Sequence, residues 1–185
     1  MSTTAIVLIA VFVIGIATAA FIVYRHQRSR QLRAQFGPEY SYAVRQYGNE
    51  SRAESALAAR ARRMERFQVK SLSPEDHDRF LERWETVQRS FVDDPAGSIE
   101  RADSLVNELL RARGYPMADF EHRAEDISVD HPRVVQNYRA AHSIAERHEA
   151  GKASTEELRQ GLVHYRALFE DLLEGHLSVE GRKRA

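Results

Sequence analysis

The feature that most constrains this chain is an uncharged apolar run close to its start. Residues 5–24 are twenty residues, AIVLIAVFVIGIATAAFIVY, without one charged side chain. A helix rises 1.5 Å per residue, so this run covers about 30 Å, the thickness of the hydrocarbon core of a bilayer. Because a helix also satisfies its own backbone amides in lipid, the run predicts a transmembrane helix.

Basic residues follow the apolar run directly and predict its orientation. Arg25, Arg28, Arg30 and Arg33 lie within nine residues of Tyr24. Positively charged residues beside a membrane segment stay on the cytoplasmic side. We therefore expect the N-terminus outside and the remainder of the chain in the cytoplasm.

A cleaved signal peptide is the competing interpretation of residues 5–24. It is favoured by Ala17-Thr18-Ala19, which resembles the small-residue pattern of a cleavage site. Three features favour a retained anchor instead: the residues before the run carry no Lys or Arg, the run is longer than that of a signal peptide, and arginines follow it immediately.

Charge is unevenly distributed, although the formal net charge of the chain is zero. Residues 25–70 hold 11 Lys or Arg against 4 Asp or Glu, whereas residues 71–185 hold 16 against 23. An acidic C-terminal part lacks the basic footprint that nucleic acid requires, so nucleic acid is not an expected partner. The absence of cysteine excludes disulfides, thiolate metal sites and a cysteine nucleophile.

Eight arginines of the basic part are predicted to lie at the membrane surface, where anionic lipid headgroups stabilise each by about 1 kcal/mol. They are Arg25, Arg28, Arg30, Arg33, Arg60, Arg62, Arg63 and Arg66. The first four also fix the topology, and that role alone is enough to explain them. The last four are not needed for topology, and their alternative role is a docking site for the acidic remainder of the chain.

Beyond residue 24, every apolar pattern has the period of a helix, and helix start signals recur at Ser73-Pro74, Asp94-Pro95 and Ser154. The sequence therefore predicts an all-α fold, a transmembrane helix followed by a five- or six-helix bundle. The predicted parts are a transmembrane helix at 5–24, a basic juxtamembrane segment at 25–50, a helical bundle at 51–175 and a disordered tail at 176–185.

The densest group of polar side chains lies between residues 119 and 131. His122 and Asp126 are four residues apart, so both lie on one face of a helix and, with Glu125, are candidate metal ligands. A metal site in a bundle also needs ligands from a second helix, and no Glu-x-x-His motif is present. Solvent-facing charges are the competing interpretation, and Asp126, Asp130 and His131 are equally explained as the cap of a helix that opens at Pro132.

Several short stretches carry a resemblance to a known family. They are LRAQFGPEY (32–40), FVDDPAG (91–97), RGYP (113–116), DISVDHP (126–132), NYRAAH (137–142), ASTEELRQ (153–160) and HYRALF (164–169). Together they resemble a family of uncharacterised bacterial proteins with one N-terminal membrane segment and a helical domain. The resemblance covers about residues 32–174 and implies a protein of the bacterial cell envelope. It implies no activity, ligand or catalytic residue.

The sequence contains no dinucleotide, P-loop, serine-hydrolase or zinc-protease motif. The leading hypothesis is therefore a non-enzymatic module without a cofactor, a cytoplasmic helical bundle tethered to the membrane that positions a protein partner there. The alternative is a ligand-binding or metal-dependent helical enzyme that uses His122, Glu125 and Asp126. A third hypothesis is self-association, through small residues of the membrane helix or through residues 51–68.

Overall fold

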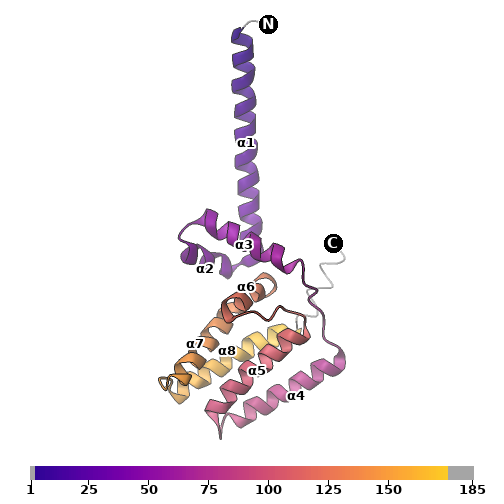
Figure 1. Cartoon of the computed structure of the whole chain (residues 1–185), viewed down its shortest axis with the longest axis vertical. Helices are drawn as coiled ribbons and strands as arrows, with labels where there is room; N and C mark the ends of the chain where they lie inside the picture. Colours follow the sequence, from indigo (N-terminus) through magenta and orange to yellow (C-terminus); the bar gives the residue numbers. More distant parts are fainter. Residues whose placement is uncertain (1–2, 175–185) are drawn as a thin grey trace. The chain divides into compact units, whose positions relative to one another are not determined.

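A computed structural model describes the backbone from residue 3 to residue 174 and the side chains from residue 12 onward. Over these residues the chain forms eight helices and no strand, which confirms the predicted all-α class (Figure 1). The helices are α1 (Thr3–Phe36), α2 (Pro38–Tyr47), α3 (Glu50–Met64), α4 (Pro74–Ser90), α5 (Pro95–Ala112), α6 (Phe120–Asp130), α7 (Val135–Glu149) and α8 (Thr155–Glu174).

The predicted transmembrane segment and the predicted tail differ in how much of each is described. In the portion of the chain whose side chains are described, no helix has an apolar stretch long enough for a membrane crossing. The backbone of the segment 5–24 is described throughout, whereas its side chains are described only from Phe12 onward. The tail predicted at 176–185 lies outside the described residues.

The chain divides into two compact units, Met1–Leu57 and Ala58–Ala185, here called the N-terminal and C-terminal units. The division falls inside α3, seven residues beyond the predicted start of the bundle at residue 51. In the N-terminal unit, α1 runs without interruption from the apolar segment through the arginines to Phe36. Gly37, at φ 44°, then turns the chain into α2. Glycine suits this position because it adopts positive φ without steric cost.

Four helices of the C-terminal unit pack in the order α4, α5, α8, α7, and α6 packs against α7 (Figure 1). Trp84 of α4 stacks on Phe169 of α8, with ring centroids 4.7 Å apart and planes 17° apart. Around this stack lies the buried apolar stripe of α5, which includes Ile99, Val106 and Leu109. Burial of these stripes, rather than the intrinsic propensity of each helix, supplies most of the stability of such a bundle.

The predicted helix starts are largely confirmed by hydrogen bonds at their caps. The side chains of Ser73 and Asp94 accept the amides of Asp76 and Gly97. Ser154 and Glu157 form a reciprocal capping box, with the Ser154 amide 2.7 Å from the Glu157 carboxylate.

The prediction was wrong around residue 130. The helix α6 continues to Asp130, and α7 begins at Val135 rather than at Pro132. Asp130 does not cap α7, whose N-cap residue Val134 makes no side-chain cap bond. The Asp130 carboxylate instead accepts the hydroxyl of Tyr115. A tertiary contact therefore replaces the predicted local one.

Candidate functional site

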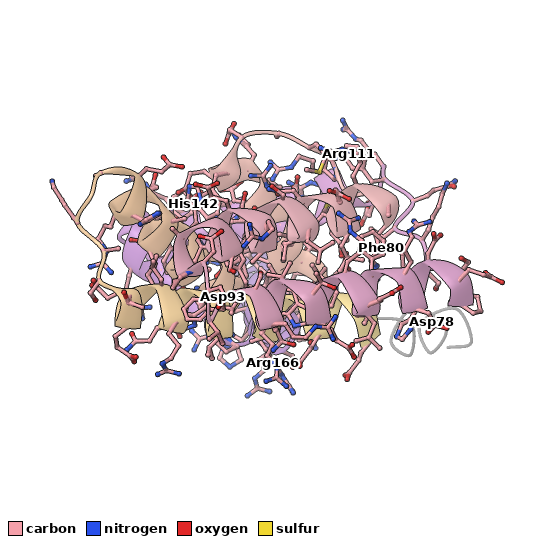
Figure 2. The ribbon with its side chains drawn as sticks, turned by 90° about the horizontal axis from the view of Figure 1, so that it is seen from below. Asp78, Phe80, Asp93, Arg111, His142 and Arg166 are labelled. Carbon is pink, nitrogen blue, oxygen red and sulfur yellow. The ribbon has the colours of Figure 1, made fainter. Side chains whose placement is uncertain are left out.

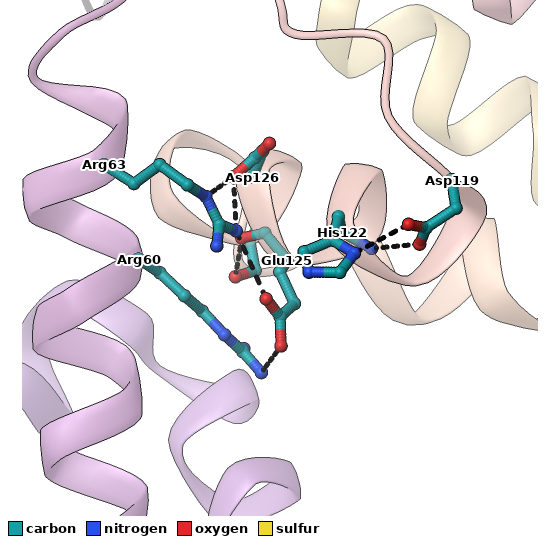
Figure 3. Close-up of polar contacts among 7 residues, drawn as sticks. Arg60, Arg63, Asp119, His122, Glu125 and Asp126 are labelled. Atoms are coloured by element: carbon teal, nitrogen blue, oxygen red, sulfur yellow. Dashed lines mark hydrogen bonds and ion pairs between the residues drawn. The ribbon is translucent and has the colours of Figure 1, made fainter.

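Two arginines at the end of α3 contact two carboxylates of α6 within the C-terminal unit (Figure 3). Arg60 Nη2 lies 2.9 Å from Glu125 Oε1. Arg63 donates from Nε to Asp126 Oδ1 at 2.7 Å and from Nη2 to Glu125 Oε2 at 3.2 Å. Arg60 and Asp126 are each 2% exposed, so much of this cluster is removed from water.

Burial acts against the charges in this cluster. It raises the pKa of the Asp126 carboxyl above its ordinary value, although the hydrogen bond and the charge of Arg63 oppose the shift. The desolvation of Asp126 thus outweighs its attraction to Arg63. Buried ion pairs of this kind add little net stability, but removal of one partner is costly because it leaves a buried charge unpaired. The cluster thus links the end of α3 to α6 through paired charges.

His122 does not join the carboxylates of α6 that were predicted to share a metal with it. Asp119 is the N-cap of α6, and one of its carboxylate oxygens accepts the His122 amide. The other oxygen lies 2.8 Å from His122 Nδ1 (Figure 3). Within the described part of the chain, no group of three or more His, Asp or Glu side chains is placed to hold a metal ion. This geometry gives the predicted enzyme that would use His122, Glu125 and Asp126 no support.

The eight arginines predicted at the membrane surface have different environments. Arg25, Arg28 and Arg30 are exposed on α1, and Arg62 and Arg66 are exposed at and just after the end of α3. Arg33 is bound to Glu50 at 2.8 Å. The prediction is wrong for Arg60, which is buried against Glu125, and Arg63 is likewise held by carboxylates. Both arginines contact carboxylates of α6 instead of facing outward.

A second polar cluster ties together four segments of the C-terminal unit around Arg113. The guanidinium of Arg113, 2% exposed, donates to the carbonyl oxygens of Leu172 at 2.7 Å and Lys70 at 3.3 Å. The next residue, Gly114, has φ 85°, and a Cβ there would lie 2.8 Å from the carbonyl oxygen of Gln68. Arg113 and Gly114 thus hold the α3–α4 connection close to the end of α5.

His131 completes this cluster and resembles a catalytic histidine only in part. Its Nδ1 contacts the carboxylate of Asp171, and its Nε2 lies 3.4 Å from Arg113 Nη1. Because arginine only donates, Nε2 is the acceptor and Nδ1 carries the proton that Asp171 accepts. In an acid–base site Nε2 would face a substrate. Here it faces a buried guanidinium, so the arrangement is structural.

A third polar network crosses the core and joins α5, α6, α7 and α8. Tyr138 accepts from Arg123 Nε at 2.7 Å, and Tyr165 donates to Asp103 Oδ1 at 2.9 Å. The side chain of Asn107 links the two halves, because it donates to Asp103 and accepts from Tyr138. Both tyrosines are fully buried. Burial raises the pKa of Tyr138 to about 12, against the opposing charge of Arg123, and raises the pKa of Tyr165 as well.

These tyrosines predict that the C-terminal unit loses stability in alkali. The folded state raises the tyrosine pKa above its unfolded value of about 10, so the stabilisation is complete below pH 10 and is lost as pH rises toward 12. Two pKa units correspond to about 2–3 kcal/mol from Tyr138 alone. Urea unfolding followed by circular dichroism at pH 8, 10 and 11 measures the loss. If the urea concentration at the midpoint of unfolding is no lower at pH 11 than at pH 10, the prediction is contradicted.

Two histidines at the edge of the core, His142 and His164, are half-buried. The ring of His142 stacks on Phe120 with centroids 3.6 Å apart, and His164 Nδ1 lies 3.0 Å from the side-chain oxygen of Asn137. Charged side chains such as Arg111 and Arg166 project from the surface of the bundle (Figure 2). The ring nitrogen Nε2 of His142 also lies 3.6 Å from the exposed carboxylate of Glu146, one turn further along α7.

A surface groove of about 620 Å³ lies between α4 and α5, and sequence reasoning did not identify it. Its lining repeats one motif on two antiparallel helices, Glu-Arg-x-x-Thr-Val at 82–87 and Glu-Arg-x-x-Ser-Leu at 100–105. Arg83 is bound to Glu108 and Arg101 to Asp94. The rims of the groove thus carry both positive and negative charges, and the side chains of Val87 and Leu105 at its floor are buried. This mixture of charges does not indicate one class of ligand.

Comparisons with protein families, with curated proteins and with solved structures gave no match to this chain.

Proposed function

We propose that this protein is a membrane-tethered helical interaction module, which holds a protein partner at the cytoplasmic face of a bacterial inner membrane. The tether is the segment 5–24, a single-pass helix with the N-terminus outside. The partner-binding part is the helical bundle. The bacterial source follows the resemblance described above, and the orientation follows the arginines after residue 24.

The observation that carries this proposal is the exposure of α1. Its large apolar side chains between Phe12 and Tyr24 are 54–69% exposed, and they lie on every face of the helix. A soluble helix normally buries an apolar stripe and is polar elsewhere. Apolar side chains on all faces are stable only when something other than water surrounds the helix. The hydrocarbon of a bilayer fits a segment of this length.

Alkaline extraction of membranes tests the tether. The full chain should stay in the membrane pellet at pH 11, and a variant lacking residues 1–24 should appear in the supernatant. A variant with twenty leucines in place of residues 5–24 is the matched control, because it keeps apolarity and discards side-chain detail. Retention of the leucine variant in the pellet would indicate that residues 5–24 lie in the bilayer. Its release would indicate that α1 binds a specific protein receptor, and this would contradict the tether.

The orientation and the interaction role need separate measurements. A reporter fused after Ala185 should be active only if it requires the cytoplasm, and activity of a periplasm-dependent reporter would contradict the proposed topology. Chemical crosslinking in intact cells should give the same adduct repeatedly with the full chain. The adduct should weaken when residues 1–24 are removed, because the tether raises the local concentration of the module. Equal yields with and without the tether would argue against a positioning role.

A further inference from the structure

Three arginines of α1 directly follow the apolar run and, like Arg62 and Arg66 after it in the chain, have no side-chain partner among the described residues. Arg25, Arg28 and Arg30 are exposed, and none has an ion pair or hydrogen bond to another described residue. Arg33, three residues further on, is bound to Glu50 and lies 4.7 Å from the centre of the Tyr40 ring. Arg33 is therefore already paired within the N-terminal unit, whereas the first three arginines can bind an anionic group outside the protein.

The position of these three arginines along α1 matches the depth of lipid headgroups. Because α1 continues unbroken past Tyr24, Arg25 follows the apolar run by about 2 Å and Arg30 by about 9 Å. The headgroup region on each side of a bilayer is about 5–8 Å thick, and long arginine side chains reach along it. Arg33 lies about 14 Å beyond Tyr24 and thus outside this layer.

The three arginines also surround the helix rather than line one side of it. At 100° per residue, Arg28 and Arg30 are turned from Arg25 by about 300° and 140°. A stripe of charge would face one partner, but a ring faces lipid on all sides. It also repels a second copy of α1 at this level, which disfavours the self-association predicted for the membrane helix.

We infer that Arg25, Arg28 and Arg30 form a ring that binds the phosphate-bearing headgroups of anionic phospholipids around α1. This inference rests on the proposed tether, since it requires residues 5–24 to lie in the bilayer. Each contact of an arginine with an anionic headgroup favours it by about 1 kcal/mol, or about fivefold. The lipids next to α1 are therefore enriched in anionic species relative to the bulk.

Electron paramagnetic resonance of spin-labelled lipids tests this inference on the full chain in phosphatidylcholine vesicles. Spin-labelled phosphatidylglycerol should associate with the wild-type chain about fivefold more strongly than spin-labelled phosphatidylcholine. The variant R25Q/R28Q/R30Q should lower that ratio to about one. The matched control R33Q should retain it, because Glu50 already binds this arginine. Salt at 1 M should weaken the preference, since it shortens the Debye length to about 3 Å.

Two results would overturn the inference. The first is an undiminished preference for phosphatidylglycerol in the triple variant, and the second is an equal loss in R33Q. Flotation of the same vesicles after alkaline treatment separates this failure from failure of the tether. A chain that floats without lipid preference refutes the arginine ring alone, whereas a chain that is washed off the vesicles refutes both proposals.

Discussion

Replacement of Trp84 with alanine is expected to lower the free energy of unfolding of the C-terminal unit by about 3–5 kcal/mol. Trp84 is 2% exposed and stacks on Phe169, which is fully buried. The substitution removes the contact between α4 and α8 and leaves a cavity that the surrounding helices fill only in part. Because this is the only tryptophan in the chain, unfolding of the variant must be followed by circular dichroism rather than by fluorescence.

Two further variants show whether the cavity causes the loss. Leu81→Ala, on the same helix but 40% exposed, should cost much less than Trp84→Ala. Trp84→Phe should also cost less, because phenylalanine keeps the stack. It also removes a buried indole N–H that meets no acceptor among the described residues. A Trp84→Phe variant as unstable as Trp84→Ala would show that the ring stack is not the source of the stability.

Replacement of Arg113 with methionine is expected to lower the free energy of unfolding of the C-terminal unit by about 2–4 kcal/mol. Methionine retains the apolar stem but leaves the carbonyl oxygens of Leu172 and Lys70 and the Nε2 of His131 without their donor. A buried polar group that loses its partner costs about 1–3 kcal/mol. The α3–α4 connection, the end of α5 and the end of α8 lose their common contact, so all three should become more mobile.

Urea unfolding measures the stability change, and hydrogen exchange of the Lys70 amide, which donates to the Arg113 carbonyl at 2.8 Å, measures the local effect. Arg111→Met is the matched control. Arg111 is exposed two residues earlier on the same helix, so its replacement should change stability by no more than about 0.5 kcal/mol. If the two variants are equally stable, the buried contacts of Arg113 contribute nothing measurable.

Local features of this fold could be predicted from the sequence, because they depend on neighbouring residues. Ser73-Pro74, Asp94-Pro95 and Ser154 each start a helix, since a short polar side chain there accepts an amide two or three residues later. The stripes that bury Trp84, Val106 and Tyr165 follow the helical period. The starts of α4, α5 and α8 were thus located without any knowledge of how the helices pack.

Contacts between distant residues could not be predicted in the same way. The pairing of Arg60 with Glu125 joins residues 65 positions apart, and that of His131 with Asp171 joins residues 40 apart. From sequence, Glu125 and Asp126 were metal-ligand candidates, because residues three and four positions after His122 share its face of a helix. Which cation they meet depends on which helix packs against α6. In the structure the end of α3 packs there, and its Arg60 and Arg63 bind both carboxylates.

The uninterrupted course of α1 has a mechanical consequence. If residues 5–24 lie in a bilayer, the twelve residues from Arg25 to Phe36 form a rigid lever about 18 Å long. Bilayers of different thickness change the tilt of a membrane helix, and a tilt of 20° would move the end of this lever sideways by about 6 Å. Quenching of a fluorophore at the exposed residue 35 in bilayers of increasing acyl-chain length would detect this movement. A change in bilayer thickness would then displace Phe36, because α1 has no break before this residue at which the chain could bend.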